Sequence, residues 1–224
     1  MRAVFGLAGT VAAYTPFGRV SGAHVSPSVS LAFSLARRLG WVDLCGYVAA
    51  QMLGACLAAV LLAGVGHVLP VWGKMAQDAT FAATVPFSGV AVVWPLVTEM
   101  VLTCLLVIML CALAAHPVLK WFTPWAGGVF FCLCNPVSAW LSGNSSNLAR
   151  SFGPAVVTGQ WDSFWIYALG PFMGRRWPSG CCVRACWAGS RWRKRGWSIS
   201  ATMAAFPPFS IPVAAWKAGL RSYD

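Results

Sequence analysis

Charged residues are scarce in this sequence. Of its 224 residues only 9% are Asp, Glu, Lys or Arg, and the chain holds just five acidic residues. Soluble globular domains carry about 25% charged residues. This scarcity, together with an apolar content of 58%, excludes an ordinary soluble enzyme.

Charge is entirely missing from two long stretches of the chain. Residues 44–73 and residues 121–149 contain no Asp, Glu, Lys or Arg, and Glu99 is the only such residue between Asp78 and Lys120. Uncharged, mostly apolar runs of about 18 or more residues are typical of membrane-spanning helices. The sequence therefore predicts an integral, multi-pass membrane protein with roughly four to six spans.

The residue patterns of an enzyme or a metal site are also missing. The sequence has no HExxH motif, no paired Asp residues inside spans and no Ser and His arrangement at a sensible depth. Six of the nine cysteines lie inside apolar runs, where a thiol behaves as a small hydrophobe. We expect no catalytic residue, no metal, no cofactor and no disulfide scaffold.

Basic residues gather near the C-terminal end. The formal net charge is +11, and nine of the 16 basic residues lie in 171–224. The chain thus divides into an apolar body, residues 1–174, and a basic tail rich in Trp and Cys, residues 175–224.

The start of this tail suggests a shifted reading frame. One back-translation of RRWPSGCC, read one nucleotide earlier, encodes ALAVGLL, which is an ordinary apolar sequence for a membrane span. We interpret the tail as out-of-frame or disordered, with no nucleic-acid partner; a basic membrane-binding module is the alternative.

The body alternates between full spans and two shorter helices. Ser26 is the expected N-cap of one short helix, because Pro27 suits the first helical position, and Asn147 is the expected cap of the other. About ten residues reach roughly 15 Å, half of the hydrocarbon core. The expected order is an apolar run 3–18 broken near Pro16, a short helix 27–36, a span 44–66, a loop 67–89, spans 90–115 and 121–141, a loop with a short helix 142–161, and a last span starting in 162–174.

Basic loops orient the predicted spans. Arg37 and Arg38 precede one span and Lys120 follows the next, so these loops share a side, which the positive-inside rule makes cytoplasmic. The two short helices then enter from opposite faces. Interrupted apolar segments in corresponding positions of two halves indicate a site at the membrane midplane.

Several motifs in this order resemble the major intrinsic protein family, the aquaporins and glycerol facilitators. They are SGAH at 21–24, GYVAAQMLGACLAA at 46–59, Glu99, SGNSSNLARSFGPAVV at 142–157 and WIYALGP at 165–171. The resemblance covers about residues 1–174 and implies an all-α, inverted-repeat bundle with two re-entrant half-helices. It also implies a passive channel for water or small neutral solutes, set in membrane lipid of the plasma (cell inner) membrane, and a homotetramer if the chain is intact.

Four features depart from the family pattern. The resemblance leads us to expect that the family's first span is missing, because Met1 falls near the start of what resembles the second. The two Asn-Pro-Ala motifs are replaced by Ser26-Pro27-Ser28 and Asn147-Leu148-Ala149. The last span is disrupted after Gly174. A non-conducting remnant of a channel is therefore the alternative, and osmotic swelling of proteoliposomes distinguishes the two.

The resemblance also assigns site residues. Asn147 donates its side-chain N–H to passing water, and Ser26 takes the equivalent role in the other half. Arg150 forms the outer constriction with Phe5, Asn135 and Asn144. Each of three positions has an alternative interpretation: Phe5 is a core or lipid-facing aromatic, Asn135 is only a helix-breaking residue, and Arg150 is an interfacial anchor.

Other positions of the resemblance carry structural or selective roles. His24 and Glu99 support the half-helices through hydrogen bonds. Ser151 stands where glycerol facilitators usually have Asp, which favours water over glycerol. No nucleophile or metal is needed, because a pore requires only a narrow apolar path, a few aligned donors and a positive barrier against cations.

Overall fold

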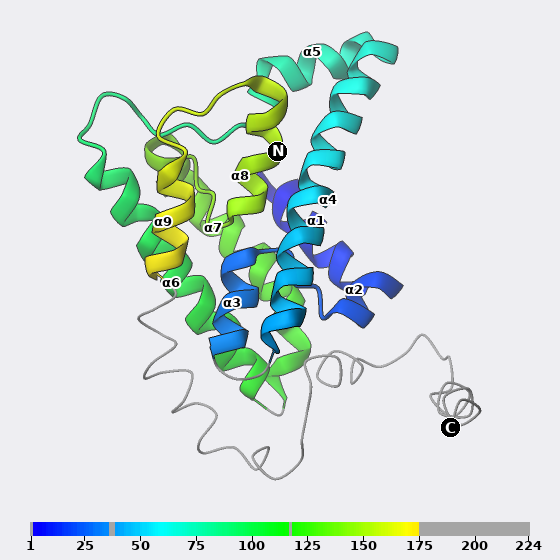
Figure 1. Ribbon diagram of the computed structural model, residues 1–224, viewed down its shortest axis with the longest axis vertical. Helices are drawn as coiled ribbons and strands as arrows, with labels where there is room; N and C mark the ends of the chain where they lie inside the picture. Colours follow the sequence, from blue (N-terminus) through cyan, green and yellow to red (C-terminus); the bar gives the residue numbers. More distant parts are fainter. Residues whose placement is uncertain (1, 36–38, 117, 175–224) are drawn as a thin grey trace.

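The computed structural model describes residues 2–35, 39–116 and 118–174, and these residues form helices joined by loops and turns (Figure 1). The apolar body is therefore helical, as the sequence predicts, whereas the predicted tail lies outside the described residues. The elements are α1 (Arg2–Tyr14), α2 (Pro16–Ser21), α3 (Pro27–Leu35), α4 (Trp41–Val68), α5 (Pro70–Asp78), η1 (Thr80–Ala82), α6 (Val93–Ala115), η2 (Leu119–Phe122), α7 (Thr123–Ser142), α8 (Leu148–Thr158) and α9 (Trp165–Gly174).

The break near Pro16 is confirmed and has a local cause. Thr15 caps α2, because its Oγ1 accepts the backbone N–H of Gly18 at 3.0 Å. Pro16 occupies the first turn of α2, where its missing N–H leaves no intrahelical bond unmade. The first apolar run is thus two helices, α1 and α2, with a bend between them.

Two helices of the described chain are long and apolar enough to cross a membrane. They are α4, with 28 residues, and α6, with 23. α7 has 20 residues and contains Pro136. The exposed residues of α4 are largely apolar, among them Leu53, Leu57 and Leu61, which suits a surface covered by lipid.

The predicted loop at 67–89 is wrong in its first half. α4 continues to Val68, and residues Pro70–Asp78 form the separate helix α5. Leu69 breaks the helix, with φ −117° and ψ 89°, and Pro70 starts the next one. Gly66 and Gly73 then pack backbone to backbone across this corner, a contact between distant turns that the local pattern does not reveal.

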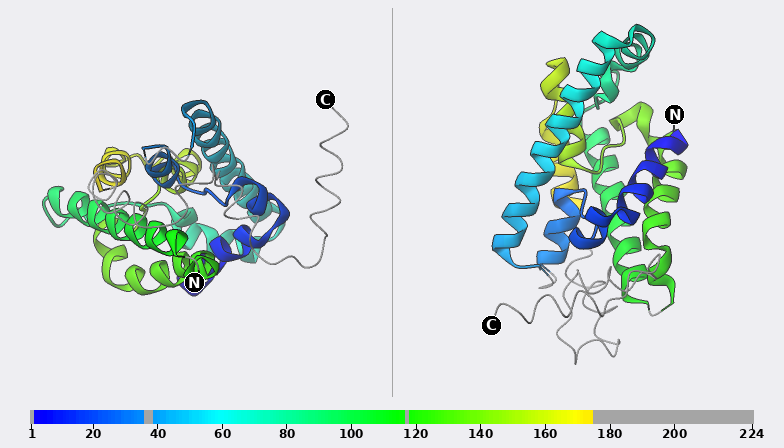
Figure 2. Two further views of the ribbon diagram at one scale, coloured as in Figure 1. Left: turned by 90° about the horizontal axis from the view of Figure 1, so that it is seen from below. Right: turned by 90° about the vertical axis from the view of Figure 1, so that its right-hand side faces the viewer.

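Helices pack where small residues allow their backbones to approach. α1 lies against α7, and a Cβ added to Gly128 would lie 2.8 Å from the carbonyl oxygen of Gly6. α4 lies against α8 in the same way, with Gly153 facing the backbone of Ala55. Close packing of small residues is a main source of helix association in membranes. Figure 2 (right) shows α4 along one side of the bundle and α1 and α7 along the other.

The two short helices sit inside this frame and point away from one another. α3 contacts α4, α6 and α8, while α8 also contacts α4 and α9. In Figure 1, α3 runs from the middle of the bundle toward one end and α8 from the middle toward the other. The half-helices therefore approach from opposite ends, as the sequence predicts.

Candidate functional site

Asn147 joins the N-terminal tips of α3 and α8. Its backbone is extended, with φ −156° and ψ 111°, and its Oδ1 accepts the N–H of Ala149 at 3.1 Å, so Asn147 is the N-cap of α8 as predicted. Its Nδ2 donates to the carbonyl oxygen of Val25 at 2.8 Å. Because Val25 lies two residues before α3, this bond brings the two tips together.

Ser26 occupies the start of α3 without capping it through its side chain. Its carbonyl oxygen accepts the N–H of Ser30 at 3.0 Å and the hydroxyl of Ser30 at 3.2 Å. The hydroxyl of Ser26 is buried and has no hydrogen-bond partner among the described residues. The predicted side-chain cap is therefore wrong, since backbone acceptors and long-range donors fix this tip instead. Pro27 and Ser28 are buried beside it.

The tip of α3 is held by side chains from α4. Gln51 Nε2 donates to the carbonyl oxygen of His24 at 2.6 Å and to the hydroxyl of Ser30 at 2.9 Å. Tyr47 donates its hydroxyl to the carbonyl oxygen of Ser21 at 2.6 Å. His24 is buried, pairs with the Ser30 hydroxyl at 3.1 Å and contacts the rings of Phe33 and Tyr47, at centroid distances of 5.1 and 5.2 Å. These contacts agree with a supporting role for His24.

The loop before α8 is organised by one buried carboxylate. Glu99 in α6 is 0% exposed. Its Oε1 accepts the hydroxyl of Ser142 at 2.8 Å and the N–H of Ser145 at 2.9 Å, and its Oε2 accepts the N–H of Ser146 at 2.6 Å. Tyr167 in α9 adds a bond from its hydroxyl to the carbonyl oxygen of Ser142 at 2.8 Å. Glu99 therefore accepts the backbone N–H groups of a buried loop. These bonds also keep its carboxylate away from lipid, where an acid inside a span would be costly.

Arg150 lies in the first turn of α8 and is bonded to the segment that connects α5 and α6. Its Nη1 donates to the carbonyl oxygen of Ala82 at 2.7 Å. Thr84 reinforces this connection, because its hydroxyl donates to that of Ser151 at 2.7 Å. Ser151 in turn contacts the hydroxyl of Ser145, and that hydroxyl donates to the carbonyl oxygen of Asn147 at 2.8 Å. A continuous hydrogen-bonded chain thus links the connection to the cap of α8.

The remaining predicted site residues occupy different environments. Asn144 is 2% exposed, has φ +48°, and neither its Nδ2 nor its Oδ1 has a hydrogen-bond partner among the described residues. Asn135 is half-buried in α7, next to Pro136. Phe5 belongs to α1, but its side chain lies outside the described ones. Leu148 begins α8 and is half-buried, and Ala149 is buried.

Sequence reasoning missed the residues that hold the site from a distance. Gln51, Thr84 and Tyr167 each bond to a segment that is at least 21 residues away in the chain. Gln51 and Tyr167 lie inside the resemblance motifs at 46–59 and 165–171, which could have pointed to them, whereas Thr84 lies in none of the motifs. Within the described ranges, no group of three or more His, Cys, Asp or Glu side chains is placed to hold a metal ion.

The family model described as Major intrinsic protein matches residues 1–178. The chain belongs to the major intrinsic protein family. Members of this family are membrane channels and not enzymes.

Individual major intrinsic proteins resemble the chain in sequence and in fold. Aquaporin NIP1-1 of Oryza sativa subsp. japonica is 36% identical over 172 residues, which is 76% of this chain and 57% of the relative. Nodulin-26 of Glycine max is also 36% identical over 172 residues, 76% of this chain and 59% of the relative. The chain therefore spans little more than half the length of the curated relatives it matches. The aquaglyceroporin from Plasmodium falciparum shares the fold, with a TM-score of 0.64, 19% identity and 82% of each chain covered.

Proposed function

We propose that this major intrinsic protein conducts water or small uncharged solutes passively across the membrane. The bond between Asn147 Nδ2 and the Val25 carbonyl oxygen supports this function most directly, because it sets two helix N-termini against each other. Each N-terminus carries roughly half a positive charge. Two such tips at one point oppose the passage of cations and protons while leaving neutral molecules unaffected.

Asn147 has the donor geometry that a water path requires. Its carboxamide nitrogen carries two hydrogens, of which one bonds to Val25. The second is then available to a passing water. Such a donor orients the water and interrupts the hydrogen-bonded chain along which protons move. Ser26 takes the equivalent position at the tip of α3, where its carbonyl oxygen starts the helix and its buried hydroxyl has no hydrogen-bond partner among the described residues.

Arg150 forms the outer constriction in this proposal, with Phe5, Asn135 and Asn144 as its partners. The bond from its Nη1 to the Ala82 carbonyl oxygen fixes the guanidinium at one end of α8. A cation at this position adds to the barrier against other cations. Ser151 stands where glycerol facilitators usually have Asp, and this difference favours water over glycerol as the solute.

Stopped-flow osmotic shrinkage of liposomes that contain the full 224-residue chain tests the proposal. We expect faster shrinkage than in protein-free liposomes, with a shallower temperature dependence. Asn147→Leu removes the donor and the α8 cap, so water permeability falls toward the protein-free value. Gln77→Leu makes the same kind of change on the exposed surface of α5 and leaves permeability unchanged.

The same experiment separates a channel from a non-conducting remnant. Shrinkage equal to that of protein-free liposomes, with the chain inserted and folded, contradicts conduction and favours the remnant. Assembly as a homotetramer and residence in the plasma (cell inner) membrane remain part of the proposal. Chemical cross-linking in native membranes tests the first, and membrane fractionation tests the second.

A further inference from the structure

Helix α5 groups its large apolar residues on one arc. At about 100° per residue, Val71, Met75 and Trp72 fall within an arc of about 100°, whereas Lys74 and Gln77 fall outside it and Asp78 lies at its edge, about 20° from Val71. Such an arrangement normally buries the apolar arc against protein or lipid.

The apolar arc of α5 is not covered by the described protein. Val71 is 72% exposed, Trp72 61% and Met75 50%. The buried position of the helix is Gly73 alone, which packs on the backbone of Gly66 in α4. The contact with α4 therefore fixes the helix at the corner while its apolar side chains stay outside.

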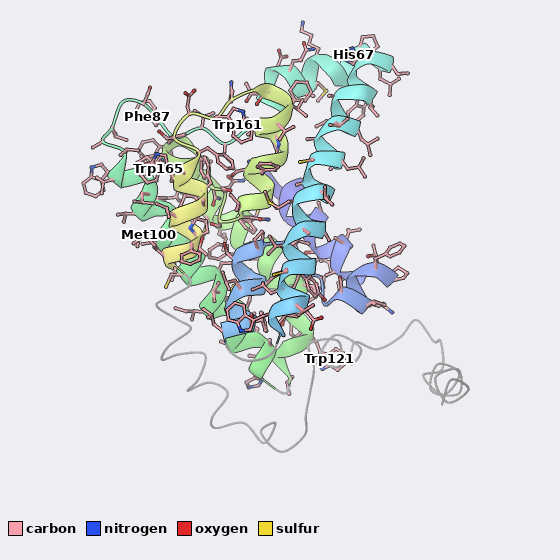
Figure 3. The ribbon with its side chains drawn as sticks, in the orientation of Figure 1. His67, Phe87, Met100, Trp121, Trp161 and Trp165 are labelled. Atoms are coloured by element: carbon pink, nitrogen blue, oxygen red, sulfur yellow. The ribbon has the colours of Figure 1, made fainter. Side chains whose placement is uncertain are left out.

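The length of α4 is sufficient for this corner to reach the membrane surface. Its 28 residues extend about 42 Å, whereas the hydrocarbon core is roughly 30 Å thick. Figure 3 shows His67, at the end of α4, at the same end of the molecule as Phe87, Trp161 and Trp165, with Trp121 at the opposite end. Trp and Tyr collect at the interfaces of membrane proteins, so Trp161 and Trp165 mark the headgroup level at the end of the molecule where His67 also lies.

We propose that α5 is an interfacial helix that docks on the phospholipid surface through Val71, Trp72 and Met75. The apolar arc of α5 contacts the glycerol and upper acyl region of the bilayer. The same lipid also covers the exposed apolar side of α4. Lys74 and Asp78 have opposite charges, so the docking depends on apolar burial and needs no anionic lipid. The helix thereby anchors the outer corner of the chain that leads to Ala82, the partner of Arg150.

Photolabelling of the full chain in phosphatidylcholine liposomes tests this docking. One liposome set contains a phosphatidylcholine with a diazirine near the glycerol, and the other a diazirine at the acyl end. We expect the shallow probe to label Val71, Trp72 and Met75 about fivefold more than Lys74 and Gln77, because only one arc meets lipid. Carbenes insert readily beside heteroatoms, so the reagent itself favours the polar side chains of Lys74 and Gln77. The expected excess on the apolar arc therefore cannot come from the reagent. The deep probe should label Leu53 and Leu57 in α4 and leave α5 almost unlabelled.

A pair of variants separates docking from a general disturbance of the fold. Trp72→Gln combined with Met75→Gln weakens the apolar arc, and labelling of Val71 by the shallow probe should fall about fivefold. Gln77→Ala leaves the shallow labelling of Val71 unchanged. Labelling of Leu53 by the deep probe stays constant in all variants.

Three results would overturn the inference. They are equal labelling of the apolar arc and of Lys74 and Gln77, no lipid adduct on the apolar arc, and deep labelling of α5 that exceeds shallow labelling. Cross-links from the apolar arc to a second copy of the chain, without lipid adducts, would assign the surface to protein and overturn it as well.

Discussion

Replacing Glu99 with Gln measures how strongly one buried carboxylate organises the loop before α8. The side chain accepts hydrogen bonds from Ser142, Ser145 and Ser146, at 2.8, 2.9 and 2.6 Å. Gln is nearly isosteric and keeps one acceptor oxygen, which can retain the bonds from Ser142 and Ser145. Its NH2 group then faces the N–H of Ser146, so a donor meets a donor in a site that excludes water.

The magnitude follows from these three bonds. Hydrogen bonds to charged groups contribute about 1.5–3 kcal/mol each, and a buried unsatisfied group costs about 1–3 kcal/mol. The lower desolvation cost of the neutral amide offsets part of the loss. We expect Glu99→Gln to lower the free energy of unfolding by about 2–4 kcal/mol, and Glu99→Ala, which strands three donors, by more.

Reversible unfolding in mixed detergent micelles measures this difference. Asp162→Asn is the matched control, because it makes the same chemical change at an exposed acid and should stay within about 0.5 kcal/mol of the unmodified chain. A Glu99→Gln value inside that same range would refute the account of the loop.

Two further substitutions probe the packing and the outer connection. Gly153→Ala would place a Cβ 2.7 Å from the carbonyl carbon of Ala55, so we expect destabilisation of about 1–3 kcal/mol in the same assay, whereas Gly54→Ala meets open space and should be neutral or slightly stabilising. No loss for Gly153→Ala would contradict the close approach of α4 and α8. Thr84→Val removes the hydroxyl that donates to Ser151 at 2.7 Å, and we expect a loss of about 1 kcal/mol with an altered ratio of water to glycerol permeability in proteoliposomes. An unchanged ratio would show that this bond does not position Arg150.

The sequence predicts the two half-helices well because their signals are local. An Asn cap before α8 and a Pro at the first position of α3 are read from neighbouring residues alone. The break at Pro16 is of the same kind, since Thr15 caps α2 and Pro16 begins it. Element types that depend on such short-range chemistry are the ones that pattern reasoning recovers.

The errors arise where contacts between elements decide the outcome. The segment at 67–89 contains prolines, glycine and charges, which favour a loop, yet the packing of Gly73 on Gly66 across the corner between α4 and α5 supports α5. The sequence predicts that the hydroxyl of Ser26 caps α3, but Gln51 from α4 stabilises that tip instead. The bond from Asn147 to Val25 spans 122 residues of the chain, and only the pairing of two interrupted segments and the family resemblance indicate that the two tips meet.

The meeting of the two tips is tested most directly by solid-state NMR of the full chain in lipid. Asparagine labelled with 15N in the side chain is combined with valine labelled with 13C at the carbonyl carbon, and the dipolar coupling between them is measured. A bond of 2.8 Å from Asn147 Nδ2 to the Val25 oxygen places the labelled nitrogen and carbon close enough for a measurable dipolar coupling, which should vanish in Val25→Leu, where the same carbonyl carries no label. Absence of this coupling in the unmodified chain, or its survival in Val25→Leu, would contradict the convergence of α3 and α8.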